Sequence, residues 1–328
     1  MVNDSLIHAM AGAVGGMVAT TATYPLTVVF TRASTEEREQ KVGLDGEEVK
    51  PKKMSDFGLL LHLLRKEPAR LFDGVESNLA AIMVTNGLYY FFYENMRDFL
   101  LKSRKGTKAL STRESMLAGL VAGSATTILS NPIWVIQANQ VKQGQSSTPD
   151  AKHLSFFETA LKLYGGSEVK PGSSGLQNFW RGIGPALVLV INPIIQYTIF
   201  EQLKNVLIKR RTAKLRAVGG ALATAVAVLS DWDYFLLGAL SKLVATGSTY
   251  PYIVLKNRLQ AGNSSTAQYK SAVHGIISIV NKEGIRGLYT GVASKLLQSV
   301  LTAAILFAGQ KRIYELTKQV LTAAPALK

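Results

Sequence analysis

The chain has 328 residues, of which 47% are hydrophobic, and it carries a formal net charge of +15. Its mean hydropathy of +0.15 is too high for an ordinary soluble domain and too low for a bundle with minimal loops. The absence of cysteine excludes disulfides, thiolate catalysis and cysteine-bound metals, and no two of the four histidines lie at the spacing of metal ligands. The basic residues lie between long uncharged stretches, which argues against nucleic-acid binding.

Long uncharged stretches follow one another along the chain and predict six membrane spans. The fifth stretch is interrupted only by Lys242, and the other five contain no charged residue. A helix needs about 20 apolar residues to cross a bilayer, and most stretches approach or exceed that length. A soluble helical repeat would show amphipathic stripes instead. In chain order the stretches are 6–31, 77–93, 115–141, 182–200, 234–255 and 296–310.

Two short motifs recur three times in the same order. The first is a proline late in each odd-numbered stretch, and the second is a segment that ends in glycine ahead of each even-numbered stretch. The prolines are Pro25, Pro132 and Pro251, and the glycines are Gly74, Gly182 and Gly291. Recurrence at roughly a hundred residues indicates a tandem repeat. We therefore expect three repeats of two helices each, over residues 1–108, 109–214 and 215–328.

The three prolines predict how the odd-numbered helices pack. A proline inside a helix removes one backbone hydrogen bond, so each of these helices is expected to kink. In a membrane, the carbonyl that loses its partner needs another donor within the bundle. Three such helices could converge at one end and close a central cavity. Close helix approach is also predicted by two glycine pairs spaced by four residues, Gly12 with Gly16 and Gly119 with Gly123.

Loop charge predicts the orientation of the chain in the membrane. The N-terminus and the segments after the even-numbered spans carry more positive charge than the connections between odd and even spans. By the positive-inside rule, both termini are therefore expected on the cytosolic side.

The repeated motifs resemble those of the mitochondrial carrier superfamily, over nearly the whole chain. That family repeats Pro-x-[Asp/Glu]-x-x-[Lys/Arg] on its odd-numbered helices and an aromatic-x-Gly motif before each even one. Its even helices end in aromatic-[Asp/Glu]-x-x-[Lys/Arg], matched here at Tyr93 to Arg97 and Phe200 to Lys204, with a degenerate third copy around Phe307 to Lys311. The resemblance implies an all-α membrane protein of six transmembrane helices in three pseudo-threefold repeats. Short surface helices would lie between odd and even helices, and transport would proceed by alternating access.

The proline motif departs from the family pattern, because no acidic residue survives in it. The two charged positions after each proline hold Thr27 and Phe30, Trp134 and Gln137, and Ile253 and Lys256. The ionic network that closes family members on the side away from the cytosol therefore cannot form in full. We expect a lower barrier between open states, or a leak on that side. The network on the cytosolic side is better supplied, by Glu94, Arg97, Glu201 and Lys204.

Other segments indicate a branch of the family. The sequence from Asn131 to Val135 is similar to carriers of nucleotide-type cofactors, and the segments 187–197 and 294–298 resemble the peroxisomal members. The resemblance implies a peroxisomal membrane protein, with the mitochondrial inner membrane as the alternative. The basic cluster of Lys209, Arg210 and Arg211 suits a peroxisomal targeting segment, and a basic cytosolic loop explains it equally well.

The resemblance also implies where the solute binds, about midway along the even helices. Carried over residue by residue, the contact positions and their neighbours are Ala81, Asn86, Val188, Leu189, Asn192, Lys295 and Gln298. A lysine within a span usually faces a water-filled path or an anion, although it can also snorkel to the interface; Lys242 is added on the same argument. Together with Lys256, Arg32 and Arg258, these cations would favour a phosphate-bearing solute. Tyr89, Tyr90 and Tyr197 could flank a flat base or simply pack.

The expected function is exchange of adenine nucleotides, ATP for AMP or ADP, across the peroxisomal membrane. CoA, FAD and NAD share an adenosine phosphate portion and remain alternatives, as does a carrier-fold scaffold that transports nothing. The sequence has no phosphate loop, catalytic triad or metal set, so we expect neither an enzyme nor a cofactor. The expected partners are a small anionic nucleotide-type solute and the bilayer, with no nucleic acid, and the carrier is expected to be monomeric.

Overall fold

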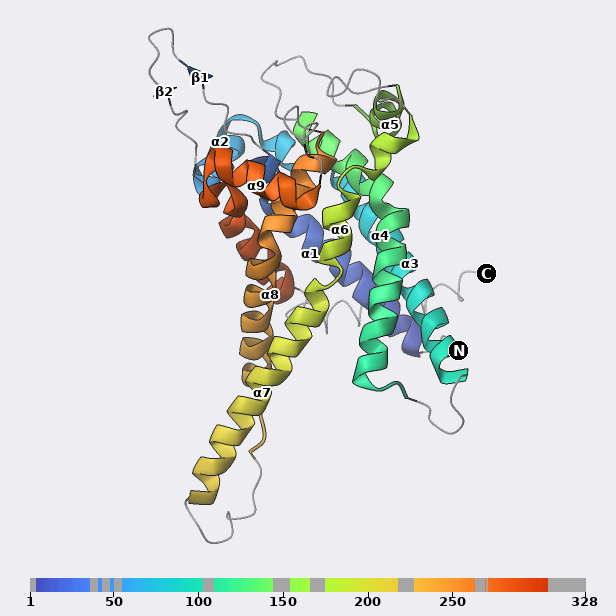
Figure 1. Ribbon diagram of the computed structural model, residues 1–328, viewed down its shortest axis with the longest axis vertical. Helices are drawn as coiled ribbons and strands as arrows, with labels where there is room; N and C mark the ends of the chain where they lie inside the picture. Colours follow the sequence, from blue (N-terminus) through green and yellow to red (C-terminus); the bar gives the residue numbers. More distant parts are fainter. Residues whose placement is uncertain are drawn as a thin grey trace, which may run out of the picture.

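A computed structural model of the protein (Figure 1) describes residues 4–35, 41–42, 48–49, 55–102, 109–143, 154–165, 175–217, 227–262, 269 and 271–305. The described regular structure is helical except for one antiparallel pairing of two-residue strands. In it, β1 (Lys41–Val42) pairs with β2 (Glu48–Val49), with Lys41 opposite Val49. The third copy of the even-helix motif, around Phe307 to Lys311, lies outside the described residues.

Long helices form the bundle, and shorter ones cover one end of it (Figure 1). The bundle consists of α1 (Asp4–Thr35), α3 (Val75–Lys102), α4 (Thr112–Gln143), α6 (Ile183–Leu189) with α7 (Asn192–Ala217), α8 (Asp231–Gln260) and residues 292–305. The surface helices are α2 (Asp56–Lys66), α5 (Phe156–Tyr164) and α9 (Ala272–Glu283). This arrangement confirms the predicted all-α fold, with a surface helix between the odd and even helices of each repeat.

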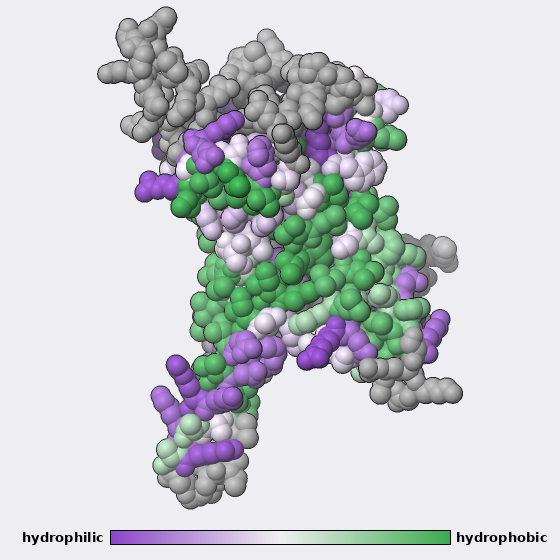
Figure 2. All heavy atoms as spheres, in the orientation of Figure 1, coloured by the Kyte–Doolittle hydropathy of each residue, from purple (hydrophilic) through white to green (hydrophobic). Residues whose placement is uncertain are grey.

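The outer surface suits a bilayer. In the described part of the chain, three segments are long and apolar enough to cross one, namely Val14–Thr35, Thr112–Gln143 and Leu176–Ala217. The other bundle helices are more polar; α8, for example, includes Lys242 and Lys256. Figure 2 shows hydrophobic side chains as a band around the middle of the visible face and hydrophilic ones towards both ends.

The surface helices begin in the same way in all three repeats. A serine precedes each helix, and its hydroxyl accepts a hydrogen bond from a backbone N–H of the first turn, at Ser55, Ser155 and Ser271. Such caps satisfy amide groups that have no partner within the helix. The sequence analysis did not use these serines, although their recurrence supports the same tandem repeat.

The proline motif and the glycine motif of each repeat are joined by one hydrogen bond. The residue before the proline donates from its side chain to a backbone carbonyl just before the glycine. Tyr24 Oη donates to Asp73 O at 2.7 Å, Asn131 Nδ2 to Arg181 O at 3.2 Å, and Tyr250 Oη to Thr290 O at 3.0 Å. The carbonyl of Ile128, which Pro132 leaves without its helical donor, accepts from Trp180 Nε1 at 2.9 Å, as the membrane environment requires.

Each glycine motif also packs against the odd helix of the next repeat. Gly74, Gly182 and Gly291 have φ angles of 74°, 73° and 78°, a left-handed conformation that favours glycine. A Cβ atom would meet Gln140 of α4 at Gly74, Lys256 O of α8 at Gly182, and Phe30 O of α1 at Gly291. These contacts run from repeat one to two, two to three and three back to one. The three repeats therefore close into a ring with threefold pseudosymmetry.

The odd helices converge at the end that the surface helices cover, and neutral hydrogen bonds hold them there. Asn139 Nδ2 of α4 donates to Gln260 O of α8 at 2.8 Å, and Asn257 Nδ2 of α8 donates to Ser34 Oγ of α1 at 2.9 Å. Gln137 Nε2 of α4 donates to Tyr24 Oη of α1 at 3.4 Å. Amide and hydroxyl groups thus join helices that ion pairs join in the family pattern.

The glycine pairs behave differently from one another. At Gly123 a Cβ atom would lie 2.6 Å from Val190 Cγ1, and at Gly119 it would lie 3.3 Å from Tyr89 Oη, so the predicted close approach is confirmed on α4. At Gly16 no atom lies within 4 Å among the described residues, and the surroundings of Gly12 are not described, so the same prediction stays a prediction for that pair. Spacing alone cannot say which face of a helix meets a neighbour.

Replacing Gly123 with Ala should lower stability by about 1–3 kcal/mol, because Val190 and its turn must move. The matched change Gly16→Ala meets nothing and should be neutral or stabilising by up to about 1 kcal/mol through helix propensity. Thermal unfolding of the purified proteins in detergent measures both changes. Equal midpoints for the two variants would contradict the assigned packing.

Replacing Tyr250 with Phe should lower stability by about 1 kcal/mol, because the carbonyl of Thr290 loses its donor. Tyr252→Phe, two residues further along the same helix, serves as the control and should leave the unfolding midpoint unchanged. If Tyr250→Phe is also silent, the hydrogen bond between the two motifs does not contribute to stability.

Candidate solute-binding cavity

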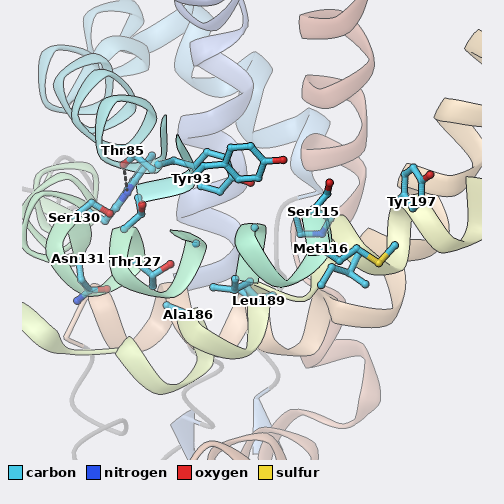
Figure 3. A pocket seen from close by; sticks show the side chains of 18 of the residues that line it. Thr85, Tyr93, Ser115, Met116, Thr127, Ser130, Asn131, Ala186, Leu189 and Tyr197 are labelled. Carbon is cyan, nitrogen blue, oxygen red and sulfur yellow. Dashed lines mark hydrogen bonds between the residues drawn. The ribbon is translucent and has the colours of Figure 1, made fainter. Parts of the chain in front are cut away.

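A cavity of about 800 Å³ lies between α3, α4, α6 with α7, and the end of α8. In Figure 3, Ser115, Met116 and Tyr197 lie towards one end of it, and Thr85, Ser130 and Asn131 towards the other. The first end is the mouth, lined by the first turns of α4 and of α7 and by Tyr93 of α3. The second lies against the converged odd helices, so the cavity is closed at that end.

The wall formed by α6 and α7 contains a break in the fourth span. Val190 and Ile191 form a turn in which each N–H donates three residues back, to Leu187 O at 3.1 Å and Val188 O at 3.2 Å. Pro193 has no N–H with which to continue the helix of α6. As the second residue of α7, it suits the start of a new helix. This break was not predicted, although the Asn192-Pro193 pair is the sequence feature that could have revealed it.

Lys256 lies at the closed end of the cavity. It is the one charged residue among the described residues that line the cavity, and its Nζ lies 5.5 Å from the centre of the Trp134 ring. Trp134 is itself fixed, because its Nε1 donates to Thr85 Oγ1 at 3.1 Å. The two residues occupy the acidic and basic positions of the proline motifs in repeats two and three. A cation–π contact therefore stands where the family pattern has an ion pair.

The four remaining charge positions of the proline motifs are filled without charge. Phe30 packs on Tyr250 and Val254, with a ring-centre distance of 6.4 Å to Tyr250, and Ile253 packs against this cluster. Gln137 binds Tyr24, and the buried hydroxyl of Thr27 has no hydrogen-bond partner among the described residues. The closed end thus combines apolar, neutral polar and cation–π contacts, all of which differ from an ionic network.

Two further lysines lie near Lys256. Lys295 Nζ donates to Gln298 Oε1 at 3.0 Å and lies 5.2 Å from the centre of the Phe30 ring. Its ammonium group is close enough to Lys242 and Lys256 to be repelled by both. No ion pair with a carboxylate is found for these three lysines in the described part of the chain. Three like charges held together without counter-ions favour the binding of an anion.

The other predicted contact residues lie in different environments. Leu189 lines the cavity, whereas Ala81 is fully buried and Asn86 and Val188 are exposed outside its lining. Asn192 joins α7 to α8, where its Nδ2 donates to Ala245 O at 3.1 Å and to Thr249 Oγ1 at 2.7 Å. The predicted positions therefore do not all face the cavity.

Arg32 and Arg258 are not available to a solute, which corrects their predicted contribution to the binding charge. Arg32 Nη2 lies 3.3 Å from Asp73 Oδ2, and both side chains are buried. Arg258, 1% exposed, forms a two-bond ion pair with Glu283 and donates from Nε to Ser34 O at 3.1 Å. The carboxylates come from the surface-helix segments, whose contacts could not be deduced from the proline motif.

At the mouth, the predicted cytosolic network is paired within helices. Arg97 Nη1 lies 2.9 Å from Glu94 Oε2 on α3, and Lys204 Nζ lies 2.6 Å from Glu201 Oε1 on α7. These pairs do not join α3 to α7, so the described helices leave the cavity open at this end. The predicted gate residues are thus at the mouth, and Lys256 with the three prolines is at the closed end.

Comparison with known proteins agrees with this geometry. Residues 3–104, 108–211 and 218–324 each match the family described as Mitochondrial carrier protein. The chain belongs to the mitochondrial carrier family. Its three matched segments place the carrier fold over almost the whole sequence, with one copy for each two-helix repeat.

Several curated relatives of this carrier are peroxisomal. The peroxisomal nicotinamide adenine dinucleotide carrier of Arabidopsis thaliana is 31% identical over 98% of this chain and 99% of its own length. Peroxisomal membrane protein PMP47B of Candida boidinii is 34% identical over 93% and 84%, and peroxisomal adenine nucleotide carrier 1 of Arabidopsis thaliana is 28% identical over 94% and 90%. These relatives confirm the peroxisomal branch: the protein is a multi-pass solute carrier of the peroxisomal membrane.

The open mouth can be tested by labelling, since the carrier has no natural cysteine. Ser115→Cys, in the cavity wall near the mouth, should react with a membrane-impermeant thiol reagent added to the cytosolic face of intact organelles. Ser241→Cys, which is fully buried, should remain unmodified. Modification of Ser115→Cys only from the opposite face would contradict the assigned orientation.

Proposed function

We propose that this carrier exchanges adenine nucleotides, ATP for AMP or ADP, across the peroxisomal membrane by alternating access. The observation that carries the proposal is the group of Lys242, Lys256 and Lys295, of which Lys256 lines the cavity and the other two lie close behind it, while no carboxylate is among the described residues that line the cavity. A polyphosphate supplies the charge that this group lacks, through charge-assisted hydrogen bonds. An uncharged or cationic solute would leave the three like charges unbalanced.

The position of Lys256 also supports coupling between binding and opening. Its ammonium group lines the cavity and at the same time contacts Trp134 across the closed end. A phosphate that attracts this ammonium group weakens the contact between α4 and α8. Part of the binding free energy thereby lowers the barrier that separates the two open states.

The cavity gives the nucleoside portion a suitable surface. Tyr89 and Tyr93 stack with ring centres 5.9 Å apart, and both line the cavity with Tyr197 on the opposite wall. Flat aromatic walls of this kind suit a purine ring. Adenine nucleotides combine such a ring with the phosphate charge that the lysines favour.

NAD is the second candidate, favoured by the similarity to the Arabidopsis carrier named for it along nearly the full length of both chains. NAD carries less net negative charge than ATP, so the cluster of three lysines argues for ATP. The two candidates are separated by comparing how strongly unlabelled ATP and unlabelled NAD inhibit the same uptake of labelled solute.

Exchange should be measured with purified carrier in liposomes, loaded with ATP, AMP, NAD or CoA and supplied with labelled ATP outside. We expect ATP uptake to depend on internal adenine nucleotide. Lys295→Ala should reduce uptake at least about 10-fold, because an anion loses one charged partner in a desolvated site. Lys282→Ala, on surface helix α9, is the control and should leave uptake unchanged.

Two results would overturn the proposal. If the wild-type carrier exchanges none of these solutes, it is not a nucleotide carrier and the scaffold alternative gains support. If it exchanges NAD or CoA but not ATP, the family and compartment stand while the adenine nucleotide assignment fails.

A further inference from the structure

One face of α4 presents hydroxyl groups to the cavity. The residues of this face recur at spacings of three and four, which keeps them on one side of a helix. Those that carry a hydroxyl are Thr112, Ser115, Thr126, Thr127 and Ser130. The predicted contact positions lie on the even helices and, for Lys242, on α8, so this face of α4 contains none of them.

Thr126 differs from Thr23 and Thr249, two other buried threonines of the bundle. In a helix, a buried threonine hydroxyl usually donates to the carbonyl four residues earlier. Thr23 does so to Ala19 O and Thr249 to Ala245 O, both at 2.8 Å. Thr126 is 3% exposed and lines the cavity, yet its hydroxyl has no hydrogen-bond partner among the described residues. A buried polar group without a partner costs free energy, which a bound ligand can recover.

Ser130 lies one turn further towards the closed end, on the same face. It is 1% exposed and also lines the cavity. Figure 3 shows Ser130 near Thr85, the residue that fixes Trp134. The two hydroxyls of Thr126 and Ser130 therefore lie between the open middle of the cavity and the cation at its closed end.

The opposite wall has the reverse character. Leu189, Val190 and Ile194, around the break between α6 and α7, present aliphatic side chains to the same cavity. The cavity therefore has one hydroxyl-bearing wall and one apolar wall, with Lys256 at its closed end. A nucleoside phosphate has the same three parts: sugar hydroxyls on one edge, a flat apolar base, and charge at one end.

We propose that Thr126 and Ser130 form a subsite for the sugar hydroxyls of the solute, which fixes its orientation in the cavity. The phosphates point to Lys256 at the closed end, the ribose lies against α4, and the base lies between the apolar wall and the tyrosines nearer the mouth. This inference rests on the proposed nucleotide transport and adds to it a preference for ribose over deoxyribose.

The test compares ATP with its 2′-deoxy and 3′-deoxy analogues as competitors of labelled ATP uptake in liposomes. The wild-type carrier should need about 3- to 10-fold more of at least one deoxy analogue for half-inhibition, the effect of one neutral hydrogen bond. Thr126→Val keeps the side-chain volume but removes the hydroxyl. The Thr126→Val variant should raise the half-saturation concentration for ATP by the same factor. Its half-inhibition concentrations for the deoxy analogue and for ATP should become about equal.

Thr159→Val is the matched control. Thr159 is fully buried and its hydroxyl also lacks a partner among the described residues, but it belongs to surface helix α5 and does not line the cavity. This variant should keep the wild-type ratio. Neither change should lower the thermal unfolding midpoint, because each removes a buried group without a partner, so a loss of ribose preference in Thr126→Val cannot be attributed to misfolding.

The outcomes distinguish the inference from the proposed function. If the wild-type carrier exchanges ATP but does not discriminate either analogue, or if Thr126→Val keeps the full discrimination, the hydroxyl subsite is wrong and nucleotide transport stands. A hydroxyl that only holds water would give this second result. If the wild-type carrier exchanges no nucleotide, the proposed function itself fails.

Discussion

The bundle depends on one hydrogen bond that is made three times, from the side chain before each helix proline to the carbonyl before each left-handed glycine. Tyr24, Asn131 and Tyr250 are the donors, and each ties the middle of an odd helix to the start of the following even helix. The glycines in turn contact the odd helix of the next repeat. The donors differ in side-chain chemistry, but each donates to the carbonyl at the same position of its repeat. The distance between the two motifs is therefore what the fold requires.

Within this symmetric frame, charge is distributed asymmetrically. Lys242, Lys256 and Lys295 all come from the third repeat, while the first and second supply aromatic, amide and hydroxyl groups to the same level of the bundle. A threefold frame can therefore hold a solute that has no threefold symmetry. The ends of a nucleotide differ in charge, and an asymmetric cavity is needed to orient them.

The closed end shows how the carrier does without the ionic network of its family. Amide side chains join the odd helices, Lys256 rests on Trp134, and two arginines are paired with carboxylates of their own repeat. Exposed ion pairs add little to stability, so their loss need not weaken the fold. The contacts that replace them depend less on salt, because most involve no pair of opposite charges.

The sequence by itself determined the six spans and the three repeats, because hydrophobic length, proline and glycine act locally and recur in register. The surface helices were implied by the family resemblance alone. The sequence also located Lys242, since a cation inside an apolar span is conspicuous, while the family resemblance pointed to Lys256 and Lys295 at the edges of such spans. Only the tertiary structure decided that Arg32 and Arg258 are paired, that Asn192 binds α8, and that Val190 contacts Gly123. These facts depend on which side chains from distant repeats share one space, and neither spacing nor composition contains that information.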